Sequence, residues 1–402
     1  MNLKLKNIYL LAVLFIAVQV TASGQFPKAG VWQGNMHFSQ ATVPFTFEVS
    51  YQEAIPVITL INGEERIDID ESLIKKDSIY MPMHVFDAFI SATFSSNKMV
   101  GYWVKLDSIP FTARFNSPRF KTSKSRKSVQ IENRINMTFS PPGGLEYPGI
   151  GLFSQQGNNV TGTILTEVGD YRYFEGVMNK NTLKLSTFDG VHAFMLTGKY
   201  EEGKWTGDFH FDNKYVEKWT GFYDESVELR DPFEMVTIDK ETERPYFDII
   251  APASGRNVVD PLEYEGKVVI IQLFGTWCPN SYDETRYLVN RYEDFHQKGV
   301  EILAVSYEVK YSEEYGLRRI DEYTNKMKIP YKVLLGGRVN KEQAAMAFPF
   351  MNRIQAFPTL IILDKHGIAR YVNSYFLGPA TGENFLEFRE RLDSIVDELL
   401  TE

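Results

Sequence analysis

Short runs in which apolar and polar residues alternate fill the first half of the chain. Residues 45–49 and 99–104 are examples, and turn signals such as Asn62-Gly63 separate such runs. Alternation with a period of two is typical of strands that bury one face, whereas the periodicity of a helix is hard to find here. The pattern therefore predicts a β-rich region over residues 25–231.

This β-rich region repeats its own pattern. Residues 77–103 align with residues 181–209, because both contain an alternating strand, a Phe-Asp pair, a second strand, a polar turn and a strand with glycine beside an aromatic residue. Duplicated meanders of this kind cover their edges by curling into a barrel or by packing as two sheets. We expect a duplicated barrel or sandwich with halves over residues 25–118 and 130–231. Its interior either holds a ligand or is filled by side chains, and the sequence leaves both alternatives open.

The pattern changes beyond residue 231. Runs that are apolar almost throughout predict buried strands at residues 268–274, 300–305 and 359–364, and a further strand follows at 368–372. Helical periodicity predicts helices at residues 281–298, 313–328, 340–349 and 382–401. Strands and helices that alternate in this way indicate an α/β sheet with helices on both faces, over residues 232–402.

The first 24 residues have the pattern of an export signal. Lys4 and Lys6 precede an apolar run over residues 8–20, and small residues follow at 22–24. A helix needs about 20 apolar residues to cross a bilayer, so this run is too short for a membrane span. We expect residues 1–24 to be a cleaved signal peptide. The mature chain is then expected to be exported, in a bacterial periplasm, and soluble, with no transmembrane span.

Charge and composition restrict the function further. The chain of 402 residues has a formal net charge of -9 at pH 7, whereas a nucleic-acid-binding protein needs a basic face. The single basic cluster is interpreted as a solvated loop; it consists of Arg119, Lys121, Lys124, Arg126 and Lys127. The six histidines do not reach the spacing of metal ligands, and no phosphate-binding loop is present. We therefore expect neither a nucleic-acid partner, nor a metal, nor a cofactor.

Cys278 is the one cysteine of the chain and lies in the stretch GTWCPNSYDE, residues 275–284. The preceding strand ends at Phe274 and a helix begins near Cys278, so the thiol lies at a helix N-terminus. Unpaired backbone N–H groups and the helix dipole stabilise a thiolate there. Pro279 suits the first helical position because it has no N–H to lose. This setting predicts a thiol pKa lowered from about 8.5 into the range of about 3.5 to 7.5.

The chain resembles thioredoxin-fold proteins, and more closely the exported TlpA-like disulfide reductases of the redoxin (AhpC/TSA-like) family. The residues that carry the resemblance are 267–280, Asp283-Glu284, the stretch AFPT at 356–359 and the stretch GPATGENF at 378–385. The resemblance covers roughly residues 233–402 and implies a thioredoxin-like fold there. It also implies a thiol–disulfide oxidoreductase whose partners are protein or low-molecular-weight thiols and disulfides. The second cysteine of the family's CxxC motif is Ser281 in this chain.

The resemblance also implies roles around the thiol. Pro358 corresponds to a proline with a cis peptide bond that faces the cysteine, and its neighbours Phe357 and Thr359 would bind an extended substrate, with Phe357 as an aromatic wall. Trp277 either shields the thiol or packs in the core. Glu284 is either a half-buried carboxylate that moves protons or an exposed helix charge. The expected catalytic positions are Cys278, Ser281, Trp277, Pro279 and Glu284.

Two main hypotheses follow for function. In the first, Cys278 alone attacks a disulfide, and the mixed disulfide lasts until an outside thiol releases it, because Ser281 cannot do so. In the second, the redoxin region is catalytically lapsed and the β-rich region holds a ligand or partner. Oxidation of Cys278 by peroxide is a third interpretation, although the peroxidatic motif is absent. Alkylation of Cys278 as fast at pH 6 as at pH 8 would favour the first hypothesis.

Overall fold

The computed structural model describes residues 26–69, 71–120, 128–212, 214–239, 264–310 and 312–402. The predicted signal peptide and most of the basic cluster lie outside these ranges. Within them, no helix combines the length and the apolar composition needed to cross a bilayer.

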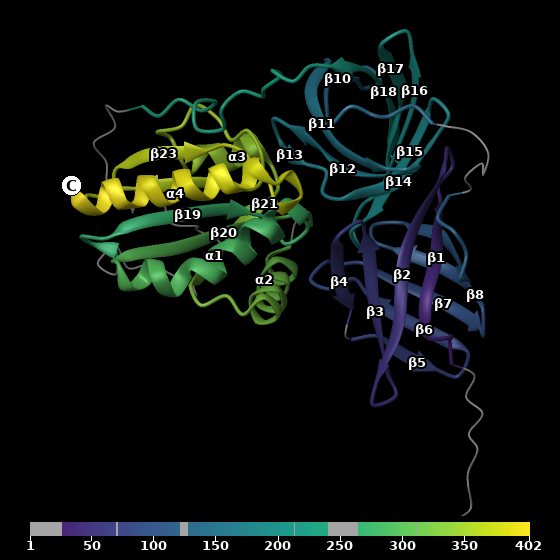
Figure 1. Ribbon diagram of the computed structural model, residues 1–402. Coiled ribbons are helices and arrows are strands. Elements are labelled where there is room, and N and C mark those ends of the chain that lie inside the picture. The colour runs from purple at the N-terminus through teal and green to yellow at the C-terminus, as the bar shows by residue number, and fades with distance from the viewer. Residues whose placement is uncertain (1–25, 70, 121–127, 213, 240–263, 311) are drawn as a thin grey trace, which may run out of the picture.

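Nine antiparallel strands form one curved sheet in the first half of the β-rich region (Figure 1). Alternate residues point into the core, as the burial pattern of β7 illustrates, because each strand faces the interior on one side only. The strand order is β4-β3-β2-β1-β9-β8-β7-β6-β5, and the sheet forms half a barrel. Its strands are β1 (Gly30–His37), β2 (Thr42–Gln52), β3 (Ile55–Asn62), β4 (Glu65–Ile69), β5 (Leu73–Lys75), β6 (Ser78–Pro82), β7 (Phe89–Ser95), β8 (Lys98–Val104) and β9 (Ser108–Phe115).

The second half closes into a barrel of eight strands, because β11 pairs with both β10 and β12. Aromatic side chains that are at most 1% exposed fill its interior, among them Phe139, Phe174, Trp205, Phe209 and Trp219. This interior corresponds to the side-chain-filled alternative of the two that the sequence leaves open. The strands are β10 (Arg134–Ser140), β11 (Tyr147–Gln156), β12 (Asn159–Thr166), β13 (Gly169–Asp170, attached to β12), β14 (Phe174–Asn179), β15 (Thr182–Phe188), β16 (Ala193–Glu201), β17 (Lys204–Phe211) and β18 (Tyr215–Tyr223).

The aligned repeats form equivalent meanders in the two halves. Residues 77–103 contain β6 to β8, and residues 181–209 contain β15 to β17. Phe188, at the end of β15, packs into the core of the half-barrel, where its ring centroid lies 4.5 Å from that of Phe45 and 5.5 Å from that of Trp103. The two halves therefore share part of one hydrophobic core.

Arg119 departs from the predicted solvated loop. Its side chain is 6% exposed and lies between the two halves, where it forms an ion pair with Glu175 at 3.2 Å and donates hydrogen bonds to Ser186 and to the Pro44 carbonyl. Burial lowers the pKa of Arg119 to about 10, against the opposing effect of Glu175. The interpretation as a solvated loop is wrong at this residue, because its partners are distant in sequence and leave no local signal.

The C-terminal region contains a five-stranded sheet in the order β21-β20-β19-β22-β23. Neighbours among β19, β20 and β21 are parallel, whereas β22 and β23 join antiparallel. The strands are β19 (Val268–Phe274), β20 (Val300–Glu308), β21 (Lys332–Arg338), β22 (Thr359–Leu363) and β23 (Ala369–Asn373). The sequence prediction missed β21, because its short apolar run ends at Gly336 and Gly337.

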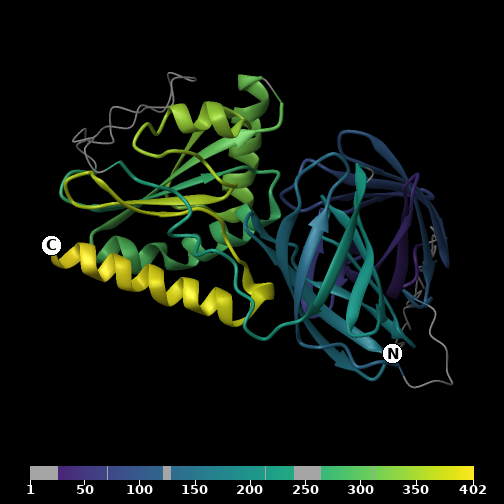
Figure 2. The same ribbon diagram turned by 90° about the horizontal axis from the view of Figure 1, so that it is seen from above.

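Helices cover both faces of this sheet (Figure 2). Side chains of α1, α2 and α4 pack with Val268 and Ile270 on one face, whereas α3 packs with Val269 and Ile271 on the other. The helices are α1 (Pro279–Gln297), α2 (Glu313–Met327), α3 (Lys341–Met346) and α4 (Glu383–Thr401), and the 3-10 turn η3 (Pro379–Thr381) precedes α4. The predicted fold class is confirmed, with an all-β region that contains a barrel followed by a thioredoxin-like α/β region.

Candidate active site

Cys278 lies in the turn between β19 and α1. It is the N-cap of the helix, with an extended backbone (φ -103°, ψ 120°), and Pro279 occupies the first turn. The Cys278 N–H donates to the Gly275 carbonyl at 3.1 Å, and the Cys278 carbonyl accepts from the Tyr282 N–H at 3.0 Å. These backbone hydrogen bonds hold the thiol at the end of the central strand, where the sequence predicted it.

The thiol itself is buried. Cys278 is 8% exposed, and its Sγ donates a hydrogen bond to the carbonyl oxygen of Phe357 at 3.4 Å. Burial raises the pKa of the thiol and outweighs the hydrogen bonds from Ser281 and Asn280, which lower it, while the charge of Asp189 raises it further. The predicted lowering of the thiol pKa is therefore wrong, because desolvation destabilises the thiolate more than the hydrogen bonds at the start of the helix stabilise it.

The loop before β22 faces the thiol with its backbone. The bond between Phe357 and Pro358 is cis, and antiparallel pairing of β22 with β19 brings it to the end of the central strand. The Phe357 ring is 6% exposed and packs against Tyr307 at 5.3 Å between centroids, so the expected aromatic wall is wrong and the ring belongs to the core. The Thr359 hydroxyl also points inward, since it donates to the Ala356 carbonyl at 2.8 Å.

A buried carboxylate holds the loop that precedes the thiol. Glu308, at the end of β20, accepts hydrogen bonds from the Thr276 N–H at 3.1 Å, the Thr276 hydroxyl at 2.9 Å and the Ser306 hydroxyl at 2.6 Å. Trp277 is partly buried at the edge of the core, and its indole N–H donates to the Tyr307 carbonyl at 2.8 Å. Sequence reasoning missed Glu308, although a charge that directly ends a buried strand is a usable signal.

Glu284 lies fully buried on the face of α1 that packs against β19. One of its carboxyl oxygens accepts from the Gln272 amide at 3.0 Å, and the other has no hydrogen-bond partner among the described residues. Burial raises the pKa of Glu284 to about 8, against the lowering effect of Gln272. The alternative of an exposed helix charge is wrong, and the carboxyl group is deeper than the half-buried proton carrier that the sequence suggests.

The β-rich region reaches the first turn of α1. Arg172 is buried, forms an ion pair with Asp283 at 2.5 Å and donates to the Pro279 carbonyl at 3.1 Å, while Glu65 of the half-barrel pairs with the same guanidinium. Asp189 accepts hydrogen bonds from the backbone N–H groups of Val191 and His192, and its charge raises the pKa of the Cys278 thiol. Sequence reasoning missed Arg172 as part of the site, because its contacts join segments more than a hundred positions apart.

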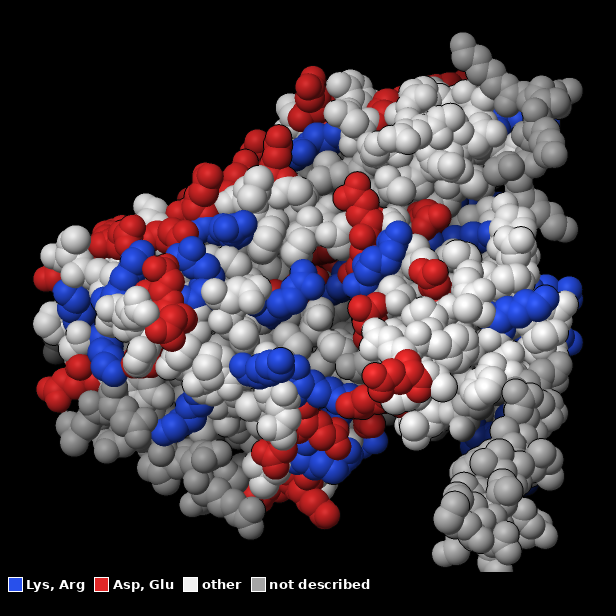
Figure 3. Space-filling view, turned by 60° about the horizontal axis from the view of Figure 1, so that its bottom comes forward, with Lys and Arg blue, Asp and Glu red and all other residues white. Residues whose placement is uncertain are grey.

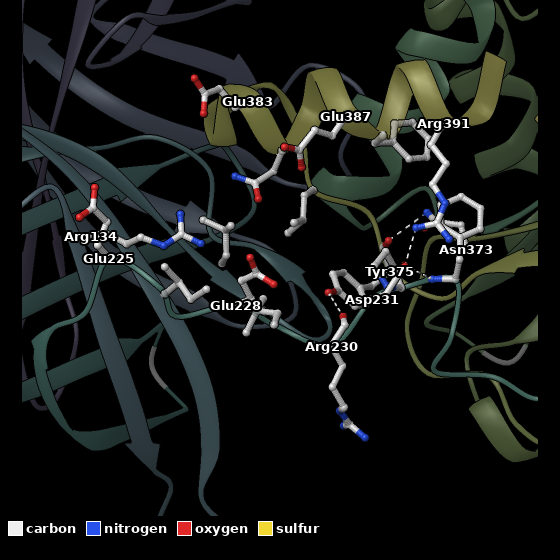
Figure 4. Close-up of a pocket in the computed structure, with 18 residues that line it drawn as sticks. Arg134, Glu225, Glu228, Arg230, Asp231, Asn373, Tyr375, Glu383, Glu387 and Arg391 are labelled. Atoms are coloured by element: carbon white, nitrogen blue, oxygen red, sulfur yellow. Dashed lines mark hydrogen bonds and ion pairs between the residues drawn. The ribbon is translucent and has the colours of Figure 1, made fainter. Parts of the chain in front are cut away.

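The cavities between the β-rich and C-terminal regions include two that differ in their walls. One, of about 260 Å³, is lined mainly by apolar atoms and has Trp277, Val191 and Leu106 in its wall. The other, of about 550 Å³, lies beside α4 and contains none of the predicted site residues. In Figure 4, Arg391 extends from α4 to Asp231, and acidic side chains from both regions surround the hollow.

Comparisons with known proteins concern the C-terminal region. Residues 243–372 match the AhpC/TSA family. The thiol-disulfide oxidoreductase ResA of Bacillus subtilis (strain 168) is 31% identical over 70 residues, which cover 17% of this chain and 38% of ResA. ResA of Geobacillus kaustophilus (strain HTA426) is 25% identical over 111 residues, 27% of this chain and 56% of that protein. The matches thus span less than two thirds of these relatives.

Two solved structures are also similar to this chain over part of its length. A thiol:disulfide interchange protein of the thioredoxin family from Chlorobium tepidum TLS is 21% identical and covers 35% of this chain and 86% of its own, with a TM-score of 0.27. The thioredoxin domain of a thiol-disulfide oxidoreductase from Bacteroides vulgatus is 23% identical and covers 33% and 86%, with a TM-score of 0.24. The AhpC/TSA match, together with the topology of the sheet, confirms the predicted redoxin resemblance of the C-terminal region.

Proposed function

We propose that this chain, whose C-terminal region is related to the AhpC/TSA redoxins and to ResA, is an exported thiol–disulfide oxidoreductase that works through Cys278 alone. The observation that carries the proposal is the position of the thiol at the N-cap of α1, with its Sγ 3.4 Å from the carbonyl that precedes Pro358. A nucleophile at a helix start beside the backbone of the loop around Pro358 is suited to attack a disulfide held along that loop.

The exchange requires two balanced steps. The Cys278 thiolate attacks one sulfur of a substrate disulfide, so that a mixed disulfide forms at Cys278 and the other sulfur leaves as a thiolate. Ser281 has no sulfur with which to displace the bound group. A second thiol, either a low-molecular-weight compound or another protein, therefore attacks the substrate sulfur of the mixed disulfide, forms a new disulfide with it and releases Cys278 as the thiolate. No net oxidant is needed, because the electrons pass from the second thiol to the substrate.

The neighbouring residues take limited roles in this proposal. The Ser281 hydroxyl stabilises the sulfur by a hydrogen bond, and Pro279 starts the helix without an unused N–H. Glu284 is a buried carboxyl group whose raised pKa of about 8 allows it to release or accept a proton near neutral pH. Pro358 and the backbone of its neighbours Phe357 and Thr359 would bind the substrate, since both of those side chains point into the core.

A second function is favoured by the burial of the thiol. A cysteine that is 8% exposed, with a raised pKa and no partner cysteine, also fits a redoxin region that has lost its activity and serves as a scaffold in a binding protein of the cell envelope. The β-rich region would then provide the binding surface.

The test is capture of a mixed disulfide on the native chain. The protein is incubated with glutathione disulfide, and the fraction that gains one glutathione at Cys278 is followed by intact-mass spectrometry, with Cys278→Ser as the control for the site. Adduct formation on the folded protein supports exchange. Adduct formation only after unfolding by denaturant would contradict it and leave the scaffold function.

A further inference from the structure

The β-rich region contacts the first turn of α1, the helix that begins at the thiol, through several groups of residues. Arg172 is the central contact, since its guanidinium binds Asp283 and the Pro279 carbonyl on α1 and Glu65 on the half-barrel. This one side chain therefore connects both halves of the β-rich region with the first turn of the helix that begins at Cys278.

Two backbone contacts lie beside Arg172. The Gly378 N–H donates to the carboxylate of Asp170 at 2.7 Å. Gly169 has a φ of +126°, and a Cβ at this position would lie 2.0 Å from the side-chain nitrogen of Asn280. The loop after β12 thus packs directly against the residues that follow the thiol.

A second group of contacts closes the opposite edge. Asp87, between β6 and β7, accepts hydrogen bonds from Lys310 at 3.3 Å and from the Tyr315 hydroxyl at 2.9 Å. Lys326 pairs with Glu71 at 2.8 Å. Figure 3 shows basic and acidic side chains side by side along the junction of the two regions. These groups are partly exposed to solvent, so each pair is individually weak.

An apolar contact lies between these two groups. The ring of Tyr282, in the first turn of α1, lies 5.5 Å from that of His84 and 6.3 Å from that of Phe86. The negative charge of Asp189, in the loop after β15, adds to the burial that raises the pKa of the Cys278 thiol. The cavity of about 260 Å³ has Thr276 and Trp277, the two residues before the thiol, in its wall, and it is large enough for a small molecule and too small for a protein segment.

We propose that the β-rich region is a cap that selects by size which reagents reach Cys278, with Arg172 and Asp87 as its two points of attachment. The proposal rests on the exchange function and names its substrate class: the closed cap admits small thiols and disulfides, whereas a protein disulfide reacts only after the cap has opened. Apolar residues of the half-barrel and of the C-terminal region form one cluster, and the polar contacts lie beside it. Interfaces between domains of one chain commonly permit such motion.

The test compares two maleimides with the same reactive group. N-ethylmaleimide is small, whereas the second reagent bears a long polyethylene glycol chain. Each rate of modification of the native full-length chain at Cys278 is divided by the rate of the same reagent with the urea-unfolded chain, so that intrinsic reactivity cancels. For the closed cap we expect the large reagent to be slowed at least roughly tenfold more than the small one, because a minor open state is populated at about 10% or less.

Two variants weaken the attachment. Asp87→Ala combined with Glu71→Ala removes partly exposed carboxylates and leaves no buried charge unpaired, so folding is preserved. This double variant should increase the normalised rate of the large reagent roughly two- to fivefold, the effect of losing two surface pairs. Arg172→Met should increase it further. Asp208→Ala, which removes the barrel's surface pair with Lys218, is the matched control and should change neither rate.

The outcomes separate the cap from the exchange function. Equal normalised rates for both reagents in the wild type, or no change in the double variant, would overturn the cap. If the double variant reacts faster with the large maleimide and yet forms no adduct with glutathione disulfide, the cap stands and the exchange function fails. If the wild type forms the glutathione adduct and shows no size selection, the exchange function stands and the cap fails.

Discussion

The Cys278 thiol donates its hydrogen bond to the carbonyl oxygen of Phe357, 3.4 Å away. A thiol that acts as donor keeps its proton, and a carbonyl oxygen that accepts from it would repel a thiolate. This contact therefore acts in the same direction as burial, which raises the pKa of the thiol. Exchange chemistry must disrupt the contact before the sulfur becomes nucleophilic.

The alkylation of Cys278 should depend steeply on pH. Because the pKa of the thiol is raised, the thiolate is a minor species throughout the neutral range, and its fraction grows about tenfold per pH unit. We expect iodoacetamide to modify the native chain roughly a hundredfold faster at pH 8 than at pH 6. Equal rates at the two pH values would contradict this pKa and indicate an activated thiolate.

Ser281→Cys should shorten the life of a mixed disulfide at Cys278. Ser281 is buried one helical turn beyond the thiol and hydrogen-bonds to it, a separation that a disulfide can span. The new thiol should expel bound glutathione as an internal disulfide forms, which intact-mass spectrometry follows over time. Ser281→Ala is the matched control, and its adduct should persist as in the wild type. Equal persistence in the Cys variant would show that the two side chains do not meet.

Glu284→Gln should stabilise the protein increasingly as pH rises. The carboxyl group has a pKa of about 8 in the folded state and an ordinary value of 4.5 when unfolded, so the fold favours its protonated form. The contribution of Glu284 to the wild-type free energy of unfolding is fully present below about pH 4.5. It is lost between that value and pH 8, by about 1.4 kcal/mol per unit of pKa difference at most.

The measurement is urea unfolding of both proteins at pH 5 and pH 8. The variant's advantage in free energy of unfolding should be a few kcal/mol larger at pH 8. Gln272, which donates a hydrogen bond to this carboxyl group, is the same in both proteins. A pH-independent difference would mean that Glu284 does not titrate in this range.

Arg172→Met should destabilise the chain by about 3–5 kcal/mol, because it leaves the carboxylates of Glu65 and Asp283 buried without their cation. Urea unfolding at neutral pH measures the loss. Arg318→Met removes an exposed arginine that pairs with the partly exposed Glu322, and it should cost only about 1 kcal/mol or less. Similar losses for both variants would argue against a central position of Arg172.

The strands were predictable wherever burial follows a simple period. Alternation in β7 reflects one buried face, and the fully apolar run of β19 reflects a strand covered on both faces. β21 escaped prediction because only three apolar residues precede its two glycines. The cysteine's place at the start of α1 was also predictable, since Pro279 and the preceding strand mark it locally.

The state of the site could not be predicted in the same way. The burial of Cys278 depends on tertiary contacts, and Arg172, which contacts the residue after it, and Asp189, whose charge raises its pKa, have no motif around them. Arg119 illustrates the same limit, because a charged residue in a basic, serine-rich stretch gives no sign of a partner as distant in sequence as Glu175. Helix position alone consequently gave the wrong direction for the thiol pKa.

Gly169 packs so closely against Asn280 that a Cβ at position 169 would overlap with the side-chain amide of Asn280. Any side chain introduced at position 169 must adopt an unfavourable backbone conformation and also push the Asn280 amide aside. In related chains that keep this packing, the two positions are therefore expected to covary: a larger residue at the first should occur together with a smaller one at the second. Such covariation would mean that the β-rich region and the segment around the cysteine have evolved together.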